Sequence, residues 1–392
     1  MHAPTISRGR RATLLALLAL AGVAAPASLA QGAAIRAVST ITLPGSGAHA
    51  LVTAPGLRVT VYATGLPSAR FMALGPHGAV FVGSWTAGTV SVLLPAAGGA
   101  RASRVVTLLS GLTVPHGVAY HNGLLYVAEE GRVSAWRYNA ATASVSGQQV
   151  IIPNLPTGGR HVTRTVSVGP DGMLYVSIGS SCNECVDASG RAVILRYRLD
   201  GSGGTLYARG LRNPVGLAWQ PGTGRLWVTD NGRDLLGENV PPDEIDLIRQ
   251  GGDYGWPYCW GNGQVDPAVA SSAGYCAQTL PPTLGLQAHS APLGLTFSTG
   301  TLLPARYRGG LFVAYHGSAW RSQLTGYRVV YIPVSGGHAG TPQDIITGWW
   351  PAAIGVSGLV WGRPVGVLMA ADGSLLISDD AAGAVYRLAP AR

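Results

Sequence analysis

The chain has 392 residues and a formal net charge of +9. All 27 basic residues are arginines, and the absence of lysine excludes chemistry in which a lysine amine forms a Schiff base. The arginines are spread along the chain without basic runs, which disfavours a nucleic-acid-binding stripe.

The N-terminus has the pattern of a secretory signal peptide. Arg8, Arg10 and Arg11 precede an apolar run at residues 14–25, and small residues follow as far as Ala30. About twelve apolar residues are too few to span a bilayer, so a membrane anchor is the weaker alternative. We therefore expect a signal peptide at residues 1–30, cleaved near Ala30, and a periplasmic or secreted protein. The sequence leaves the Sec and twin-arginine routes open, and no later segment has the apolar length needed for stable membrane insertion.

The rest of the chain is typical of an all-β protein with an internal repeat. Glycine occurs 56 times, and short apolar runs alternate with Gly, Asp and Pro turns. An apolar-x-apolar strand core recurs six times at spacings of 46, 48, 51, 78 and 72 residues, and a second apolar strand follows each copy after a turn. The first residues of the six cores are Met72, Val118, Val166, Leu217, Leu295 and Val367. Four-stranded propeller blades repeat at about this period, so we predict a six-bladed β-propeller at residues 58–392 after a lead-in at 31–57.

One imidazole or guanidinium group precedes the inner strand of nearly every predicted blade. Because these loops open onto one end of the central channel, their side chains are predicted to form a pocket for a compact polyanion. The groups are Arg70, His116, His161 with Arg164, Arg212 with Asn213, His289 and Arg363.

Four cysteines in an exported chain favour disulfides. Cys182 and Cys185 form a C-x-x-C, and Cys259 and Cys276 lie 17 residues apart, so pairing within each couple is the simplest assignment. A four-cysteine zinc site is the alternative that an oxidising compartment disfavours.

Four segments together resemble the glucose/sorbosone dehydrogenase family, with the sorbosone branch nearest. They are GLRNPVGLAW at 210–219, LWVTDNGR at 226–233, PPDEI at 241–245 and GGDYGWPYC at 251–259. The family consists of soluble propeller quinoproteins that use pyrroloquinoline quinone (PQQ) and calcium. The resemblance implies a dehydrogenase that oxidises a sugar and passes electrons to a separate acceptor, a cytochrome or a quinone.

The resemblance also implies roles for individual residues. His161 matches the general base that takes a proton from a substrate hydroxyl before a hydride passes from the same carbon to the quinone. The backbone carbonyls of Gly232 and Arg233 match the ligands of the quinone's calcium, whereas Glu244 and the Tyr254 carbonyl match those of a separate structural calcium. The residues that would contact the cofactor are Arg212, Asn213, Asn231, His316, Arg363, His116 and His289.

The chain departs from the soluble glucose branch at two points. It lacks the lysine that the branch has near His316, and Arg160 stands where the branch has an aspartate before the general base. Because an arginine cannot accept the imidazole N–H and its charge opposes protonation, the pKa of His161 is expected to be low.

Two other functions remain as alternatives. A propeller of this kind can be a non-catalytic module that binds carbohydrate or a protein partner, since architecture alone implies no chemistry. A lactonase-like calcium hydrolase would place carboxylates at the channel centre, where this sequence predicts Arg and His instead.

Overall fold

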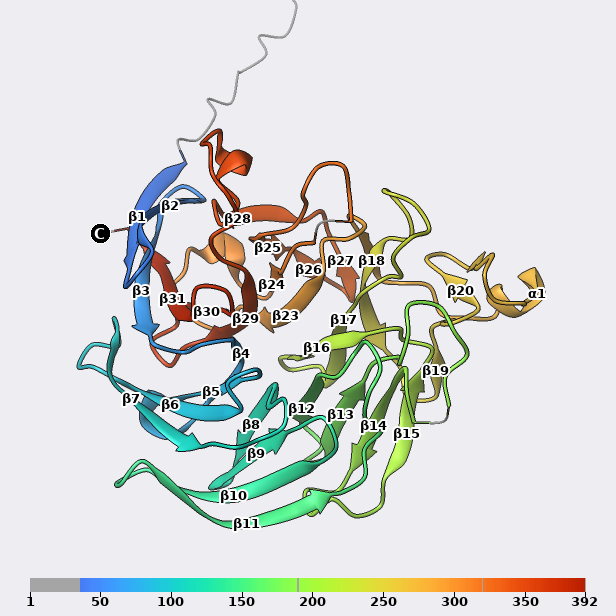
Figure 1. Cartoon of the computed structure of the whole chain (residues 1–392), viewed down its shortest axis with the longest axis horizontal. Coiled ribbons are helices and arrows are strands. Elements are labelled where there is room, and N and C mark those ends of the chain that lie inside the picture. The colour runs from blue at the N-terminus through green and yellow to red at the C-terminus, as the bar shows by residue number, and fades with distance from the viewer. Residues whose placement is uncertain (1–35, 189, 319, 392) are drawn as a thin grey trace, which may run out of the picture. The chain divides into compact units, whose positions relative to one another are not determined.

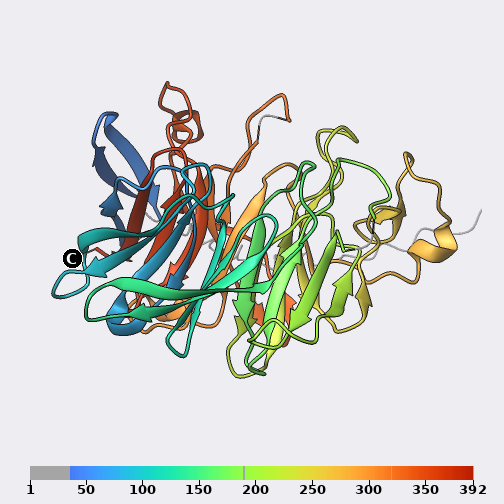
Figure 2. The same ribbon diagram turned by 60° about the horizontal axis from the view of Figure 1, so that its bottom comes forward.

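The computed structural model describes residues 36–188, 190–318 and 320–391. The expected signal peptide at residues 1–30 lies outside them. The described chain forms a six-bladed β-propeller, with its blades arranged in a ring (Figure 1) that Figure 2 shows turned by 60°.

Each blade is an antiparallel sheet whose strands follow one another outward from the channel. Blade one contains β4 (Ala69–Leu74), β5 (Val80–Ser84), β6 (Thr89–Pro95) and β7 (Ala102–Leu109). Blade two contains β8 (Gly117–His121), β9 (Leu124–Ala128), β10 (Val133–Asn139) and β11 (Ser144–Ile152). Blade three contains β12 (Arg164–Val168), β13 (Leu174–Ile178), β14 (Val193–Tyr197) and β15 (Thr205–Arg209), with β19 (Gly252–Asp253) added in parallel at its edge.

The remaining three blades follow the same plan. Blade four contains β16 (Pro214–Gln220), β17 (Arg225–Asp230), β18 (Asp243–Ile248) and β22 (Leu284–Leu286). Blade five contains β23 (Pro292–Phe297), β24 (Leu311–Tyr315), β25 (Arg328–Ile332) and β28 (Gln343–Thr347). Blade six contains β29 (Pro364–Met369), β30 (Leu375–Asp379), β31 (Ala384–Pro390) and β3 (Leu57–Thr64).

The six predicted strand cores are confirmed as the six innermost strands, and the strand predicted after each core is the next one outward. The two long spacings contain insertions. The first holds β20 (Cys259–Trp260), β21 (Gln264–Val265) and the short helix α1 (Ala273–Cys276), and the second holds β26 (Val334–Ser335), β27 (His338–Ala339) and the 3₁₀ turn Pro351–Ile354.

The ring is closed by strands from opposite ends of the described chain. β3 pairs antiparallel with β31 over seven residue pairs, from Leu57 with Pro390 to Thr64 with Ala384. β1 (Ala37–Leu43) and β2 (Gly47–Thr53) form a hairpin that extends the outer edge of blade five through β28. Because the closing pair joins distant parts of the sequence, separation of the first and last blades requires this sheet to open.

Separate apolar clusters fill the spaces between neighbouring blades. Trp227 of blade four packs against Phe297 of blade five, and Tyr175 of blade three lies with Leu226 of blade four. Both faces of such blades are therefore buried, which explains why β17 contains the continuous apolar run 226–228 and does not alternate. A smaller cluster of Val215, Leu293, Val365 and Phe71 lies among the inner strands.

Candidate active site

The residues that precede the inner strands meet at one end of the channel, because those strands all run in the same sense. A cavity of about 270 Å³ lies there. Seven of the residues predicted to act at the site line it: His161, Arg212, Asn213, Asn231, Gly232, His289 and Arg363.

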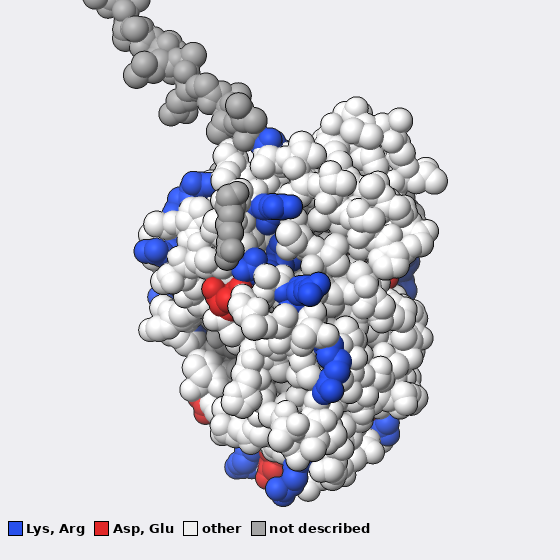
Figure 3. Space-filling model, turned by 90° about the vertical axis from the view of Figure 1, so that its left-hand side faces the viewer, with Lys and Arg blue, Asp and Glu red and all other residues white. Residues whose placement is uncertain are grey.

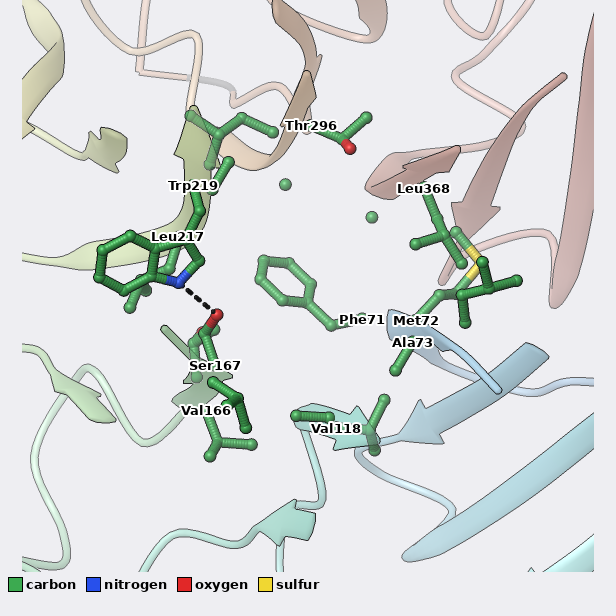
Figure 4. Close-up of a pocket in the computed structure, with 18 of the residues that line it drawn as sticks. Phe71, Met72, Ala73, Val118, Val166, Ser167, Leu217, Trp219, Thr296 and Leu368 are labelled. Atoms are coloured by element: carbon green, nitrogen blue, oxygen red, sulfur yellow. Dashed lines mark hydrogen bonds between the residues drawn. The ribbon is translucent and has the colours of Figure 1, made fainter. Parts of the chain in front are cut away.

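The other end of the channel has a different character. A hollow of about 600 Å³ is lined there by the second halves of the inner strands, with Phe71, Leu217 and Leu368 among its side chains (Figure 4). The indole of Trp219 donates a hydrogen bond to Ser167 Oγ at 3.1 Å. Among the described residues, no Arg, Lys, Asp or Glu lines this hollow, so a polyanionic ligand matches the arginine-lined cavity instead.

His161 is held as a neutral base with one nitrogen engaged. Its Nδ1 lies 2.8 Å from the Ser180 carbonyl oxygen and 2.9 Å from Ser180 Oγ. The carbonyl can only accept, so Nδ1 carries the proton and Nε2 keeps its lone pair. Burial, and then the charge of Arg212, lower the pKa of His161 to about 3, with Arg160 contributing less. A backbone carbonyl thus orients the imidazole where the glucose branch offers a carboxylate, and the low pKa predicted from Arg160 has burial as its main cause.

Arg212 and Arg363 are buried or half-buried cations that line the cavity without a carboxylate partner. Nη1 of Arg212 donates to the Asn231 and Gly232 carbonyls at 3.0 and 2.8 Å. Arg363 donates through Nη2 to the Gly317 carbonyl at 2.5 Å and through Nε to that of His316. Within the described chain neither arginine forms an ion pair, although the carboxylates of Asp234 and Asp243 also line the cavity and act on the charge of Arg212 from a distance. A bound anion would give both arginines a direct partner.

His116, His316 and Arg70 lie beside the cavity but do not line it. Asp380 joins them: its carboxylate accepts from Arg70 Nη1 at 2.7 Å and from His316 Nε2 at 3.0 Å. Arg70 Nε donates in turn to His116 Nδ1 at 3.1 Å. Burial opposes ionisation of Asp380, but the bonds from His316 and Arg70 hold its pKa below the usual range. The side chains of His116 and His316 therefore belong to a buried hydrogen-bond network behind the cavity, in which Arg70 and Asp380 form the ion pair.

The loop at Asn231, Gly232 and Arg233 is held rigidly. Asp243 accepts from the Gly232 and Ala291 backbone N–H groups, both at 2.9 Å. A Cβ at Gly232 would lie 2.7 Å from the Pro242 carbonyl oxygen, so no side chain fits between this loop and residues 241–242. The loop presents carbonyl oxygens, the ligand type that calcium prefers, and the Gly232 oxygen that accepts from Arg212 has a second lone pair. The Gly232 carbonyl thus suits the calcium that the family resemblance implies, whereas Arg233 lines the smaller cavity on blade four and not this one.

A second oxygen-rich site lies on blade four. Glu244 and Tyr254 line a small cavity of about 30 Å³ together with Asp230. Carboxylate oxygens of Asp230, Glu244 and Asp246 lie within 4.8 Å of one another. Asp246 is fully buried, and neither of its oxygens has a hydrogen-bond partner among the described residues. Burial and mutual repulsion raise the pKa values of Glu244 and Asp246, so the residues fit a structural cation.

The cysteines pair as predicted, Cys182 with Cys185 and Cys259 with Cys276. The first disulfide closes a turn after β13, next to Ser180 and therefore next to His161. The second ties Cys259 to the end of α1 in the insertion of blade four, at the right of Figure 1.

Sequence reasoning missed the acids and amides that hold the site. Asp230 accepts from the backbone N–H groups of Arg212 and Asn213 at 2.8 and 2.6 Å. Other residues that accept hydrogen bonds from groups of the site in the same way are Asp243, Asp380, Ser180 and Asn183. Asp243 and Asp230 lie inside the segments that carry the family resemblance, which was the available signal, whereas Asn183 bonds to Arg212 across 29 positions of sequence.

The described surface shows no continuous basic band on the face in Figure 3, where arginines lie in separate patches among uncharged side chains. Among the described helices, none has the length and apolar character needed to cross a membrane.

Comparison with known proteins identifies relatives along most of the chain. The family model described as TrAA12-like matches residues 51–391. A pyrroloquinoline quinone-dependent sugar dehydrogenase of Hypocrea jecorina is 29% identical over 324 residues, covering 68% of this chain and 73% of that protein. A pyrroloquinoline quinone-dependent pyranose dehydrogenase of Coprinopsis cinerea is 25% identical over 413 residues, and the match covers 85% of this chain and 54% of that protein.

Solved structures give the same fold. The calcium structure of a Trichoderma reesei enzyme of carbohydrate-active enzyme family AA12 superposes with a TM-score of 0.76 at 25% identity, covering 87% of this chain and 97% of that one. The holo pyranose dehydrogenase PQQ domain of Coprinopsis cinerea gives a TM-score of 0.75 at 22% identity, covering 90% of this chain and 100% of that one.

Proposed function

The chain belongs to the TrAA12-like family of β-propellers, and on that premise we propose that it is a PQQ-dependent dehydrogenase that oxidises a sugar. The observation that carries the proposal is a neutral imidazole facing a cavity in which two of the three lining arginines, Arg212 and Arg363, form no ion pair among the described residues. Relatives named as PQQ-dependent sugar and pyranose dehydrogenases support it.

His161 is the proposed general base. Its Nδ1–H is held by the Ser180 carbonyl, so Nε2 is free to accept the proton of a substrate hydroxyl. Because burial and Arg212 keep the ring neutral, the base is ready at any pH above about 4. The quinone, when bound, would supply the two-electron oxidising capacity that the reaction needs.

The remaining residues of the cavity would seat the cofactor. Arg212 and Arg363 offer guanidinium groups to anionic oxygens, and Asn213 and Asn231 offer amides beside them. The carbonyls of Gly232 and Arg233 are the proposed ligands of the cofactor's calcium. Glu244 and Tyr254, together with Asp230 and Asp246, are the proposed seat of a separate structural calcium.

Export and a separate electron acceptor complete the proposal. Two disulfides support an oxidising compartment, in agreement with the signal-peptide pattern at residues 1–30. The identity of the sugar, and membership of the sorbosone branch, remain predictions from the resemblance.

Reconstitution of the purified protein tests the function. The metal-free protein is mixed with PQQ and calcium, and reduction of an artificial electron acceptor is followed over a panel of aldoses, ketoses and sugar-derived aldehydes. Turnover that needs both PQQ and calcium is the expected result. Quinone binding without turnover on any sugar would favour the non-catalytic alternative, and no quinone binding would refute the assignment of the cavity.

A further inference from the structure

The turn closed by the Cys182–Cys185 disulfide contains a residue that holds a cavity arginine from behind. Asn183 has only 7% of its surface exposed. Its backbone oxygen accepts from Arg212 Nε at 3.1 Å, and its Oδ1 accepts from Arg212 Nη2 at 2.9 Å. One residue therefore engages the whole inner edge of the Arg212 guanidinium.

The side-chain amide is fixed as well. Asn183 Oδ1 also accepts from the Asp234 backbone N–H at 2.8 Å, and its Nδ2 donates to the Asp234 carbonyl at 3.0 Å. The amide cannot turn over without losing all of these bonds, because donor and acceptor would exchange places. Its orientation toward Arg212 is thus determined by the backbone of a different loop.

The donor inventory of Arg212 shows what this arrangement leaves. A guanidinium has five N–H donors. Nε and one Nη2–H point to Asn183, and Nη1 serves the Asn231 and Gly232 carbonyls. Among the described residues this leaves one Nη2–H for a ligand in the cavity that Arg212 lines.

The same turn supports the proposed base. Ser180 Oγ donates to the Cys182 carbonyl at 2.9 Å, and the Ser180 carbonyl oxygen accepts from His161 Nδ1. The disulfide spans only three positions and restrains the backbone between these two sets of contacts. We propose that Asn183, held in this disulfide-closed turn, is a positioning residue that keeps Arg212 aimed at the cofactor cavity.

The effect of Asn183 on PQQ binding rests on the proposed function. Its effect on the position of the Arg212 guanidinium does not. Asn183→Ala removes the Oδ1 acceptor and leaves the backbone oxygen. Hydrogen bonds to charged groups typically change equilibria by about ten- to hundredfold, so PQQ binding should weaken by roughly that factor. Asn183→Asp keeps an oxygen for both Arg212 and the Asp234 N–H, but its second oxygen replaces the Nδ2 that donates to the Asp234 carbonyl and to Glu184 Oε2. It should therefore restore part of the affinity.

Asn139→Ala is the matched control. Asn139 also accepts two backbone N–H groups in a loop, those of Ala141 and Thr142, but it lies at the outer hairpin of blade two. It should lose some thermal stability and no PQQ affinity. The double variant Cys182→Ser/Cys185→Ser should weaken PQQ binding in the same direction as Asn183→Ala, because the turn loses its covalent closure.

PQQ affinity is measured by quenching of tryptophan fluorescence in the presence of calcium, beside the melting temperature and a crystal structure of each variant. The expected result is weaker binding by Asn183→Ala, with the Arg212 guanidinium displaced in the crystal and partial recovery in Asn183→Asp. Unchanged PQQ affinity with Arg212 in place, or a loss of stability alone, would overturn the inference. If Asn183→Ala does not fold, the aspartate and double-serine variants make the same comparison. If the wild-type protein binds no PQQ, the proposed function fails, and the position of Arg212 in the crystals still decides the inference.

Discussion

Replacing Asp246 by asparagine tests whether the carboxylates on blade four hold a cation. Asp246 is fully buried beside Glu244 and Asp230, and neither of its oxygens has a partner in the described chain. Such a carboxyl must either be protonated or face a cation, and asparagine has opposite consequences in the two cases. Asp200→Asn, in an exposed turn, is a matched control because the same change there is remote from the cluster.

The magnitude follows from proton linkage. Burial and repulsion by Glu244 raise the pKa of Asp246 well above its usual value. Keeping a carboxyl with an unfolded pKa of about 3.9 protonated at pH 7 costs about 4 kcal/mol at most. The calcium-free protein should therefore lose stability as the pH rises from about 5 to 8, and asparagine should remove part of that loss. Calcium at a hundredfold excess over its dissociation constant should instead stabilise the wild-type protein by about 2.7 kcal/mol.

Melting temperatures measure both effects. With an unfolding entropy of about 0.75 kcal/mol/K for the unit Arg36–Arg392, 2.7 kcal/mol corresponds to a shift of roughly 4 °C. Chelation should lower the melting temperature of the wild-type protein by about this amount. The Asp246→Asn variant should be the more stable protein without calcium and should gain less when calcium is added. The carboxyl would be shown to be protonated, without a cation, if chelation leaves the wild-type melting temperature unchanged and Asp246→Asn raises it equally with and without calcium.

Four further predictions follow from the residues of the cavity. His161→Ala should lower kcat by about 10²–10⁴-fold while the melting temperature and PQQ affinity stay near wild type, and a variant that turns over normally would remove His161 from the reaction. Because burial and Arg212 lower the pKa of His161 to about 3, kcat/KM should show no loss from its protonation down to about pH 4. Unfolding by urea should nevertheless become easier as the pH falls from about 6.5, since the unfolded chain then binds a proton that the folded chain refuses. Arg363→Ala should weaken PQQ binding by about tenfold or more in the fluorescence titration, and an unchanged dissociation constant would place the anion elsewhere.

The sequence predicted the blades because each inner strand repeats a local pattern. Apolar-x-apolar cores followed by glycine turns, as at Val118 and Val166, are visible within a few residues and recur at the propeller period. Two pairings differ, because their strands lie far apart in the sequence: β2 of the N-terminal hairpin pairs with β28, and β3 pairs with β31. No local pattern predicts that Leu57 pairs with Pro390.

The same distinction applies to the site. Residues that precede inner strands, such as His161 and Arg212, could be placed at one mouth because strand direction fixes which end they occupy. Their partners could not be placed, because Asn183 and Ser180 belong to a loop after the second strand of blade three. The sequence also assigned His116 and His316 to the cofactor, whereas the structure shows their rings in hydrogen bonds with Arg70 and Asp380. Strand position identifies the mouth but not the direction in which a ring points.

The distribution of ion pairs gives the strongest reason to expect an anion in the cavity. Arg70 and Arg233 are buried and each faces a carboxylate, Asp380 at 2.7 Å and Asp266 at 2.5 Å. Arg212 and Arg363 line the cavity and face only carbonyl and amide oxygens in the described chain. A buried charge without a counter-charge is costly, so an anion in the cavity would stabilise both arginines. Arg164 is also fully buried without an ion pair among the described residues, but it lies outside the cavity and donates to the carbonyl oxygens of Pro156, His161 and Thr163. The lysine-free composition suits this arrangement, because the planar guanidinium of Arg212 can bind carbonyl and amide oxygens through four N–H groups and still keep one for an anion.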